Sequence, residues 1–371
     1  MNLRHILWPD VDTGLWNDWR WQYKNRLKGA EGLFKLSTLL QKDLSHLSHV
    51  IKTYRWASTP YYISLIQDKN LLQDPIGRQI IPSPHEIQKQ SYPQLSLDPL
   101  KERLYSPVPG LIHRYKDRVV LLASGICASY CRHCNRKRTW KKPEHLSLTK
   151  HALNKVKAYL DANPEIREVI ISGGDPLLLP FKSIKRVLSV MRSIPTIEVI
   201  RIGTRVPVVL PMRITDRLCR LLHKNRPIWI NTHFNHPREV TKEASGAIEK
   251  IQLAGIPVSN QTVLLKGIND NHDVLKSLFC KLQSIMVRPY YLFQCDQVCG
   301  TLHFWVPLSK GIEIMESMWG DTGGMCIPNF VADLPEGYGK ARLLPSQILD
   351  MEDGKEAIFF TYDKKIVKIH L

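Results

Sequence analysis

Three cysteines are the residues of this chain whose spacing points most directly to chemistry. Cys127, Cys131 and Cys134 lie in the run GICASYCRHCNRKR with the spacing C-x3-C-x2-C. Thiolates this close together can bind three irons of a cubane iron–sulfur cluster, and the fourth iron then stays open to an outside ligand. The spacing therefore predicts a metal centre that takes part in a reaction and does not only carry electrons.

A structural zinc knuckle with His133 as the fourth ligand is the alternative interpretation of the same run. Structural zinc sites usually take four ligands from two short pairs that lie some distance apart. The other cysteines are scattered along the chain, and only Cys295 and Cys299 lie close together. The ligand count therefore favours a cluster held by the three cysteines of the motif.

The composition is that of a soluble globular enzyme. Of the 371 residues, 43% are hydrophobic and 23% are charged, which leaves material for a large core. The amino-terminal run MNLRHILWPDVDTGLW lacks the pattern of a signal peptide, and no apolar stretch reaches the ~18 residues of a membrane span. Unpaired cysteines and an oxygen-sensitive cluster lead us to expect a cytoplasmic protein.

The formal net charge of +18 raises the question of nucleic-acid binding. Apart from the locally basic run RHCNRKRTWKK, the positive residues are spread from end to end. The sequence has no low-complexity tail and no aromatic-rich RNA motif. We therefore do not expect a nucleic-acid partner, and the local charge suits anionic substrates and cofactors.

The elements that must position the cysteines follow a repeating pattern. From residue 118 to 296, short apolar runs alternate with helical periods at intervals of roughly 30 residues. Continuous apolar runs followed by polar turns and a helix are typical of parallel strands buried on both faces. This rhythm predicts an α/β fold, a partial (β/α)6 TIM-like barrel. The expected strands are RVVLLAS, EVIISGG, EVIRIGT, PIWINTHF, VSNQTVLL and RPYYLFQ.

Two further regions flank the predicted barrel. Residues 1–117 contain the amphipathic helical runs WNDWRWQYKNRL and LFKLSTLLQ and then an irregular, proline-rich approach through SPVPGLIHRY. Residues 297–371 end in EAIFFTYDKKIVKIHL, which alternates like a terminal hairpin. We therefore expect an amino-terminal helical extension, the barrel at 118–296 and a carboxyl-terminal region.

Candidate site residues fall at the carboxyl ends of the expected strands, where barrel enzymes place their active sites. Gly173, Gly174 and Asp175 end the second strand, one βα unit after the cysteines. The glycines permit a close approach of the backbone, and the carboxylate can accept a hydrogen bond from an ammonium group. A plain glycine turn before a helix is the alternative.

Three more polar residues follow or lie within later strands. His233 comes after the fourth strand in NTHFNHP and is a candidate for a cofactor pocket. Asn260 and Gln261 lie near the start of the fifth strand. These two side chains either donate to a cofactor or satisfy the backbone of the barrel.

The cysteine motif resembles that of the radical S-adenosylmethionine (SAM) superfamily, which places an aromatic or imidazole ring, here His133, before the third cysteine. From about Trp16 to about Leu344 the chain is similar to the lysine 2,3-aminomutase family. The shared strings are WNDWRWQ, TPYYISLI, SPVPGLIHRY, RIGTRVPVVLPMRIT, NTHFNHP, NQTVLLKGIND, RPYYLFQCD, SKGIE and EGYGK.

The resemblance implies a [4Fe–4S] cluster, SAM chelated at its open iron, and pyridoxal phosphate (PLP). Lys340, in DLPEGYGK, is then the lysine that bonds to PLP, and it follows Gly337 and Gly339, which we expect to form a flexible loop. Arg114 and Arg118 are the partners of the PLP phosphate. The resemblance places Gly173, Gly174, Asp175 and His133 at the SAM site. His233 is a further candidate for the SAM pocket, and Asn260 and Gln261 are candidates for cofactor binding.

The resemblance also implies the substrate. Arg136, just after the third cysteine, matches the arginine that grips the substrate carboxylate, and Asp296 and Asp333 match the two aspartates around the distal ammonium of lysine. A buried ammonium needs such carboxylates, since burying it alone costs several kcal/mol. We therefore expect interconversion of L-lysine and β-lysine. Other cationic amino acids, arginine or ornithine, and supply of β-lysine for modification of a translation factor remain open.

Partners are implied in the same way. We expect an electron donor, a reductase or a flavodoxin or ferredoxin, and a homo-oligomer. Some family members bridge subunits with zinc, but Asn271 stands where their loop cysteine would be. Two rival hypotheses remain, a radical SAM enzyme that modifies RNA or protein and an iron–sulfur or zinc-binding interaction module.

Overall fold

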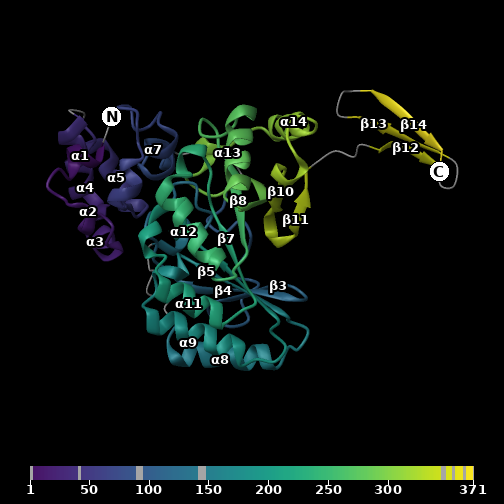
Figure 1. Ribbon diagram of the computed structural model, residues 1–371, viewed down its shortest axis with the longest axis horizontal. Helices are drawn as coiled ribbons and strands as arrows, with labels where there is room; N and C mark the ends of the chain where they lie inside the picture. Colours follow the sequence, from purple (N-terminus) through teal and green to yellow (C-terminus); the bar gives the residue numbers. More distant parts are fainter. Residues whose placement is uncertain are drawn as a thin grey trace.

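The computed structural model describes residues 3–40, 43–88, 95–140, 148–343, 348–352, 356–361 and 365–370. In this part of the chain the largest sheet has nine strands, in the order β11-β10-β9-β8-β7-β6-β5-β4-β3. The sheet curves through the centre of the molecule with helices along its outer side (Figure 1). No helix of the described residues is both long enough and apolar enough to cross a membrane.

Seven consecutive strands of this sheet are parallel, and the first six of them are the strands of the expected partial barrel. All six were predicted from the sequence, and so was the fold class. The strands are β4 (Arg118–Ser124), β5 (Glu168–Gly173), β6 (Val199–Gly203), β7 (Ile228–Thr232), β8 (Val258–Leu264) and β9 (Arg288–Gln294).

A helix follows each of these strands and packs on the outer side of the sheet (Figure 1). Three of the helices begin after a threonine whose hydroxyl accepts a backbone N–H of the first turn. Threonine is a common residue at this capping position. The helices are α8 (Lys150–Asp161), α9 (Phe181–Arg192), α11 (Asp216–Lys224), α12 (Lys242–Leu253), α13 (His272–Ser284) and α14 (Leu308–Met318).

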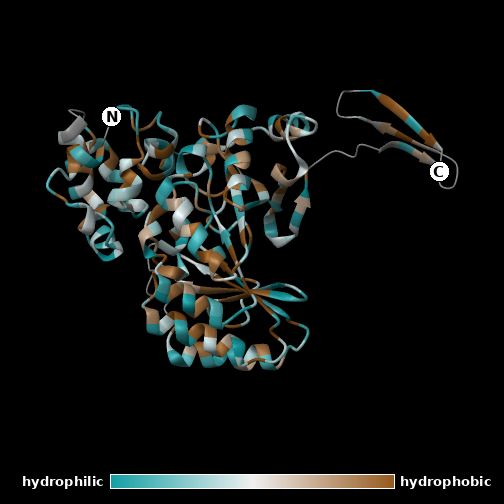
Figure 2. Ribbon diagram, in the orientation of Figure 1, coloured by the Kyte–Doolittle hydropathy of each residue, from teal (hydrophilic) through white to brown (hydrophobic). Residues whose placement is uncertain are grey.

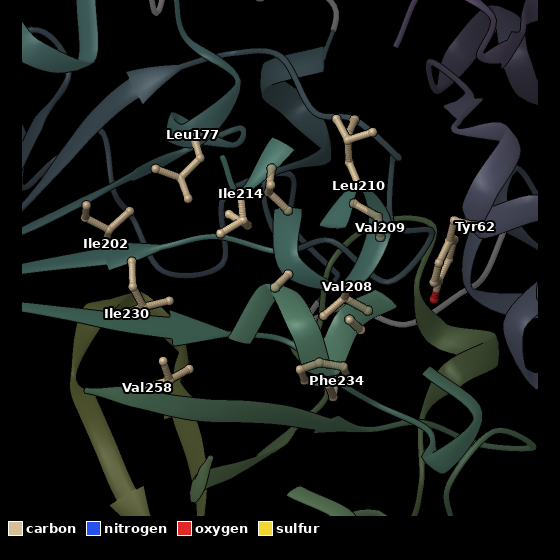
Figure 3. Close-up of a cluster of buried hydrophobic side chains, with 14 of the residues drawn as sticks. Tyr62, Leu177, Ile202, Val208, Val209, Leu210, Ile214, Ile230, Phe234 and Val258 are labelled. Atoms are coloured by element: carbon tan, nitrogen blue, oxygen red, sulfur yellow. The ribbon is translucent and has the colours of Figure 1, made fainter. Parts of the chain in front are cut away.

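The expectation that the strands are buried on both faces was wrong for the inner face. In β5, Val169 and Ile171 are buried under the helices, while Ile170 and Ser172 line a cavity inside the barrel. The strands carry much of the hydrophobic sequence (Figure 2). Apolar residues from several elements meet in the core shown in Figure 3, namely Tyr62, Leu177, Ile202, Val208, Val209, Leu210, Ile214, Ile230, Phe234 and Val258.

The sheet extends past both ends of the range 118–296. Strand β3 (Leu111–Tyr115) pairs antiparallel with β4, so the part of SPVPGLIHRY that we expected to be irregular is a strand at its end. At the other edge, β10 (Asn329–Leu334) runs parallel to β9, and β11 (Gly339–Arg342) returns antiparallel beside β10.

Short helices of the amino-terminal extension pack beside the barrel (Figure 1). The hydroxyl of Thr59 donates to the carbonyl of Val209, 2.6 Å away in the short helix α10 (Val206–Val209), and so joins the two parts. The elements are α1 (Leu3–Leu7), α2 (Thr13–Trp16), α3 (Trp19–Lys24), β1 (Leu27–Lys28), α4 (Gly29–Leu40), α5 (Ser48–Thr53), β2 (Ala57–Ser58), α6 (Pro60–Ser64) and α7 (Pro75–Ile80).

The carboxyl-terminal strands form a separate antiparallel sheet in the order β12-β13-β14. They are β12 (Ile348–Glu352), β13 (Glu356–Phe360) and β14 (Ile366–His370). The last two form the hairpin, and β12 adds a third strand that the sequence did not lead us to expect. This small sheet stands apart from the main body (Figure 1).

Candidate active site

A cavity of about 880 Å³ lies inside the partial barrel. It extends along β4 from Arg118 at the start of the strand to Cys127 just beyond its end. The cavity wall contains every candidate site residue named from the sequence except Asn260. The fold therefore brings the three cysteines, Lys340 and the predicted substrate residues to one space.

The amino-terminal extension holds the cysteine loop in place. The guanidinium of Arg26 donates to the carbonyl of Cys127 at 2.8 Å. The N–H of Tyr130 donates to the carbonyl of Ala57 at 3.0 Å, and the N–H of Arg132 donates to the carbonyl of Gln79 at 2.7 Å. The loop is thus positioned by residues that precede the barrel in sequence.

A buried ion network also fixes this loop. Arg132 and Lys137 both bind the carboxylate of Glu86, at 2.6 and 2.8 Å, and none of the three side chains is exposed. Burial would raise the pKa of Glu86, but the two cations lower it to about 2. Lys137 also donates to the carbonyl of Gly300 at 2.7 Å. A buried charge network of this kind favours one fixed arrangement, because losing one partner would leave the others uncompensated.

The three thiols of the motif line the cavity and are the metal ligands that the sequence predicts. Burial, followed by the neighbouring thiol of Cys131, raises the pKa of Cys134 to about 11, and burial likewise raises the pKa of Cys127. Bound metal must therefore displace their protons. Among the described residues, no three His, Cys, Asp or Glu side chains surround a point that could hold one ion. Cysteines that each bind a different iron of a cubane need not converge in this way.

Gly173 and Gly174 are required where β5 meets the cysteine loop. Gly173 has φ +119°, and a Cβ atom there would lie 2.4 Å from the carbonyl oxygen of Ser124. A Cβ atom on Gly174 would lie 2.5 Å from the carbonyl oxygen of Ile126. Backbone atoms cannot give way as the end of a side chain can. The two glycines therefore allow the second strand to press against the loop that carries the metal ligands.

Asp175 joins the ends of β5 and β6. Its carboxylate accepts from the hydroxyl of Thr204 at 2.6 Å, the N–H of Arg205 at 2.8 Å and the N–H of Leu177 at 3.1 Å. Burial raises its pKa to about 6, although these donors act in the opposite direction. Through these contacts Asp175 holds the end of β5 against the end of β6. A contact between Asp175 and SAM stays a prediction.

The polar residues just after β7 and within β8 divide into two groups. His233 and Gln261 line the cavity, and Nδ1 of His233 lies 3.0 Å from the carbonyl oxygen of Gln261. Burial lowers the pKa of His233 to about 4, so its imidazole is neutral. The assignment of Asn260 to a cofactor is corrected, because its amide pairs with the backbone of Phe234 at 2.7 and 3.0 Å and with Thr262 at 2.8 Å. Its side chain satisfies the barrel wall.

Arg136 has a partner that the sequence did not reveal. Its Nε and Nη2 donate to the carboxylate of Glu102 at 3.0 and 2.7 Å. Arg138 binds the same carboxylate. Burial would raise the pKa of Glu102, but the two guanidinium groups lower it to about 2. Glu102 lies 34 positions before Arg136, so no local spacing could have identified the pair.

The two predicted substrate aspartates and Lys340 lie close together. The register of the β10–β11 hairpin places Asp333 opposite Lys340, and its Oδ1 lies 2.5 Å from Nζ. Burial and the charge of Asp333 raise the pKa of Asp296 to about 7, against the effect of a hydrogen bond from Asn135. A pair of carboxylates in which one retains a proton is a site that favours a bound cation.

The loop before Lys340 forms a tight turn. Glu336, Gly337 and Gly339 all have positive φ, at 59°, 86° and 94°. A Cβ atom on Gly337 would lie 2.4 Å from the Tyr105 ring, and one on Gly339 would lie 3.2 Å from the hydroxyl of Tyr115. The glycines therefore let the turn pack against two tyrosines.

The rings of the same two tyrosines stack against the guanidinium groups of the predicted phosphate-binding arginines. The guanidinium of Arg114 lies 5.0 Å from the centre of the Tyr105 ring, and that of Arg118 lies 4.0 Å from the centre of the Tyr115 ring. Arg114 and Arg118 both line the cavity. Within the described part of the chain, the buried Nε of Arg114 has no hydrogen-bond partner. Two arginines, one with an unused donor, beside the turn that carries Lys340 fit an anionic group such as a phosphate.

Comparison with known proteins identifies the family to which the chain is similar. The family model described as the radical SAM superfamily matches residues 121–278. An L-lysine 2,3-aminomutase of Clostridium subterminale is 44% identical over 99% of this chain and 88% of its own length. An L-lysine 2,3-aminomutase of Fusobacterium nucleatum subsp. nucleatum is 47% identical over 94% of this chain and 81% of its own. A glutamate 2,3-aminomutase of Clostridioides difficile strain 630 is 40% identical over 95% and 82%.

Proposed function

Because the chain belongs to the lysine 2,3-aminomutase family of the radical SAM superfamily, we propose that it interconverts L-lysine and β-lysine. The observation that carries the choice of substrate is the carboxylate pair Asp296 and Asp333 at the cavity wall. The two carboxylates attract and stabilise a cationic side chain in the cavity. A glutamate side chain would instead place a further carboxylate against this pair, where like charges repel.

Membership of the superfamily brings a [4Fe–4S] cluster and SAM. Cys127, Cys131 and Cys134 would hold three irons, and SAM would occupy the fourth. When bound and reduced, these groups supply a carbon radical that removes a hydrogen atom from the substrate. The role of the protein is to hold the cysteine loop against Gly173 and Gly174 and to enclose the reacting groups away from water.

PLP is the second cofactor that we propose, with Lys340 as its covalent partner and Arg114 and Arg118 at its phosphate. When bound, it supplies the carbon–nitrogen double bond through which an amino group can migrate. The amine of Lys340 must lose a proton to react. Asp333 Oδ1 lies 2.5 Å from Nζ and holds this amine at the cavity wall. The Tyr105 and Tyr115 contacts of the turn restrict where the amine can reach.

The ends of the substrate would be bound by opposite charges. Arg136 would bind the carboxylate of the substrate, with its guanidinium held in one orientation by Glu102. Asp296 and Asp333 would bind the distal ammonium, and that ammonium would replace the Lys340 ammonium at Asp333. Arginine and ornithine also carry a terminal cation, so length and shape must separate them from lysine.

We also propose the partners that such chemistry requires. The cluster needs one electron from outside, so a reductase, flavodoxin or ferredoxin should dock near it, in a reducing cytoplasm. The separate sheet β12–β14 exposes Ile366, Val367 and Ile369, which supports association into a homo-oligomer. Sedimentation of the full chain would detect the oligomer.

The decisive experiment is an anaerobic assay of the reconstituted full-length protein with lysine, arginine, ornithine and glutamate, read by product analysis. We expect β-lysine from lysine, and robust turnover of glutamate would contradict the charge argument. Lys340→Ala should lose both activity and the visible absorbance that PLP acquires when it is bonded to a lysine. An enzyme that modifies RNA or protein would show neither PLP absorbance nor β-lysine.

A further inference from the structure

We propose that Arg205 is a positioning residue that sets the reduction potential of the iron–sulfur cluster through a hydrogen bond to the sulfur of Cys131. This inference rests on the cluster of the proposed function and not on its substrate or on PLP. Arg205 follows β6 in the run RIGTRVPVV and directly precedes α10. In the sequence, Arg205 is only part of one of the strings shared with the lysine 2,3-aminomutase family.

The contact with the metal ligand is direct. Nη1 of Arg205 lies 2.7 Å from Sγ of Cys131, and the residue is 7% exposed. Cys134, by comparison, accepts a backbone N–H from Arg136 at 3.4 Å. Cys131 therefore receives a close, charged donor.

The other nitrogens of Arg205 are held by the protein. Nη2 donates to Glu239 at 2.7 Å, to the hydroxyl of Tyr62 at 2.9 Å and to Gln79, and Nε donates to the carbonyl of His233 at 3.1 Å. Tyr62 lies at the right-hand side of the cluster drawn in Figure 3. With so many fixed partners the guanidinium cannot turn away from the sulfur.

Glu239 makes the arrangement rigid. Its side chain is fully buried, and its carboxylate also accepts the backbone N–H of Asn235 at 2.5 Å and of His236 at 2.8 Å. A buried ion pair is an expensive way to gain stability, since both charges lose their hydration. Such a pair is well suited to hold a donor at a metal ligand, where outer hydrogen bonds tune the metal.

The electronic effect follows from charge. When the cluster accepts one electron from its donor, its net charge becomes one unit more negative. A guanidinium and its N–H beside a ligand sulfur stabilise the reduced state more than the oxidised state, so they raise the potential. Arginine keeps its charge at all ordinary pH values, so this contribution does not vary with pH.

Arg205 also joins the cluster to the predicted SAM pocket. Its backbone N–H donates to Asp175 at 2.8 Å, and its Nε donates to His233. One residue thus contacts a cluster ligand and two residues that line the neighbouring wall. The position of Arg205 is therefore fixed by contacts with both the cysteine loop and the predicted SAM pocket.

The test is a potentiometric titration of the reconstituted full-length protein, without substrate or PLP, followed by electron paramagnetic resonance of the reduced cluster. Arg205→Gln should make the midpoint more negative, with about a tenfold loss in the reduction equilibrium, or ~59 mV for one electron. Arg205→Lys should shift the midpoint less, because lysine keeps the positive charge but lacks the several N–H donors of the guanidinium. Tyr62→Phe, which removes one partner of the guanidinium, should give a small shift in the same direction.

Two controls separate an effect of Arg205 on the reduction potential from a general disturbance of the structure. Arg205→Gln leaves Glu239 without its partner, so Arg205→Gln/Glu239→Gln is measured with it and should show a shift of the same sign, smaller because a nearby negative charge is also removed. Arg213→Gln removes another buried arginine, whose guanidinium stacks 4.7 Å from the Trp19 ring, and should leave the midpoint unchanged. A wild-type midpoint in the double variant would overturn the inference. A wild-type protein that binds no cluster would instead overturn the proposed function and this inference with it.

Discussion

Asp333 and Lys340 face each other across the β10–β11 hairpin, and the Oδ1 of the aspartate lies 2.5 Å from the Nζ of the lysine. One was assigned to the substrate and the other to PLP, yet they form a single ion pair. The ammonium of the incoming substrate and the amine of Lys340 therefore compete for the same carboxylate. Binding of lysine should help to release Lys340 for reaction.

Asp333→Asn removes the shared charge. We expect kcat/KM for lysine to fall about 10- to 100-fold, equivalent to about 1.4–2.7 kcal/mol, because the distal ammonium loses one of two carboxylates. Steady-state kinetics would measure the change. Asp321→Asn is the matched control, since Asp321 pairs with Lys276 on the surface, and equal losses in both variants would argue against a substrate role for Asp333.

Glu102→Gln should free the guanidinium of Arg136. We expect KM for lysine to rise about tenfold with a smaller change in kcat, because the variant weakens the orientation of a ground-state contact. The same kinetics with Glu198→Gln, which alters an exposed pair with Arg167, provide the comparison. An unchanged KM in Glu102→Gln would show that Glu102 does not orient Arg136 for the substrate.

The carboxylate pair predicts a pH dependence. The pKa of Asp296 is raised from 3.8 to about 7 by burial and by Asp333, so the group is protonated below about pH 7 and charged above it. A cationic substrate needs the charged form, and kcat/KM for lysine should therefore rise as the pH increases through about 7. Asp296→Asn should flatten this limb of the profile, and a limb that persists in the variant would exclude Asp296 as its source.

The same shift has the opposite sign for stability. Between about pH 4 and pH 7 the folded protein binds more protons at Asp296 than the unfolded chain does. This group alone therefore lowers the free energy of unfolding as the pH rises through that range. Denaturant unfolding of the protein without substrate should show a smaller decrease over this range in Asp296→Asn than in the wild type.

Gly174→Ala should disturb the cluster loop. The added Cβ atom would meet the Ile126 carbonyl at 2.5 Å, so we expect a loss of about 1–3 kcal/mol in the free energy of unfolding and less iron per chain after reconstitution. Gly246→Ala in α12 is the control, since nothing lies within 4 Å of its Cβ position. It should keep its iron and gain about 0.4–1 kcal/mol. Normal iron content in Gly174→Ala would contradict the close packing at the loop.

The sequence by itself determined the barrel and the candidate residues that meet at the cavity wall. The six parallel strands follow from apolar runs bounded by polar turns, because that periodicity is a local property of the chain. Cys127, Cys131 and Cys134 were found by their spacing alone. Lys340, Arg136 and the two aspartates followed from long strings shared with a family. The edge strand Leu111–Tyr115 was missed, since only its pairing with β4 identifies it.

The tertiary structure decided which groups are partners. Glu102 meets Arg136 and Arg205 meets Cys131 across 34 and 74 positions of sequence, and Asn260 turns toward the backbone of Phe234 instead of the cavity. Hydrogen bonds and burial depend on where distant segments return in space, and local periodicity carries no information about that return. The chain thus encodes its strands and motifs locally, while the partners that orient and tune the site exist only once the barrel closes around them.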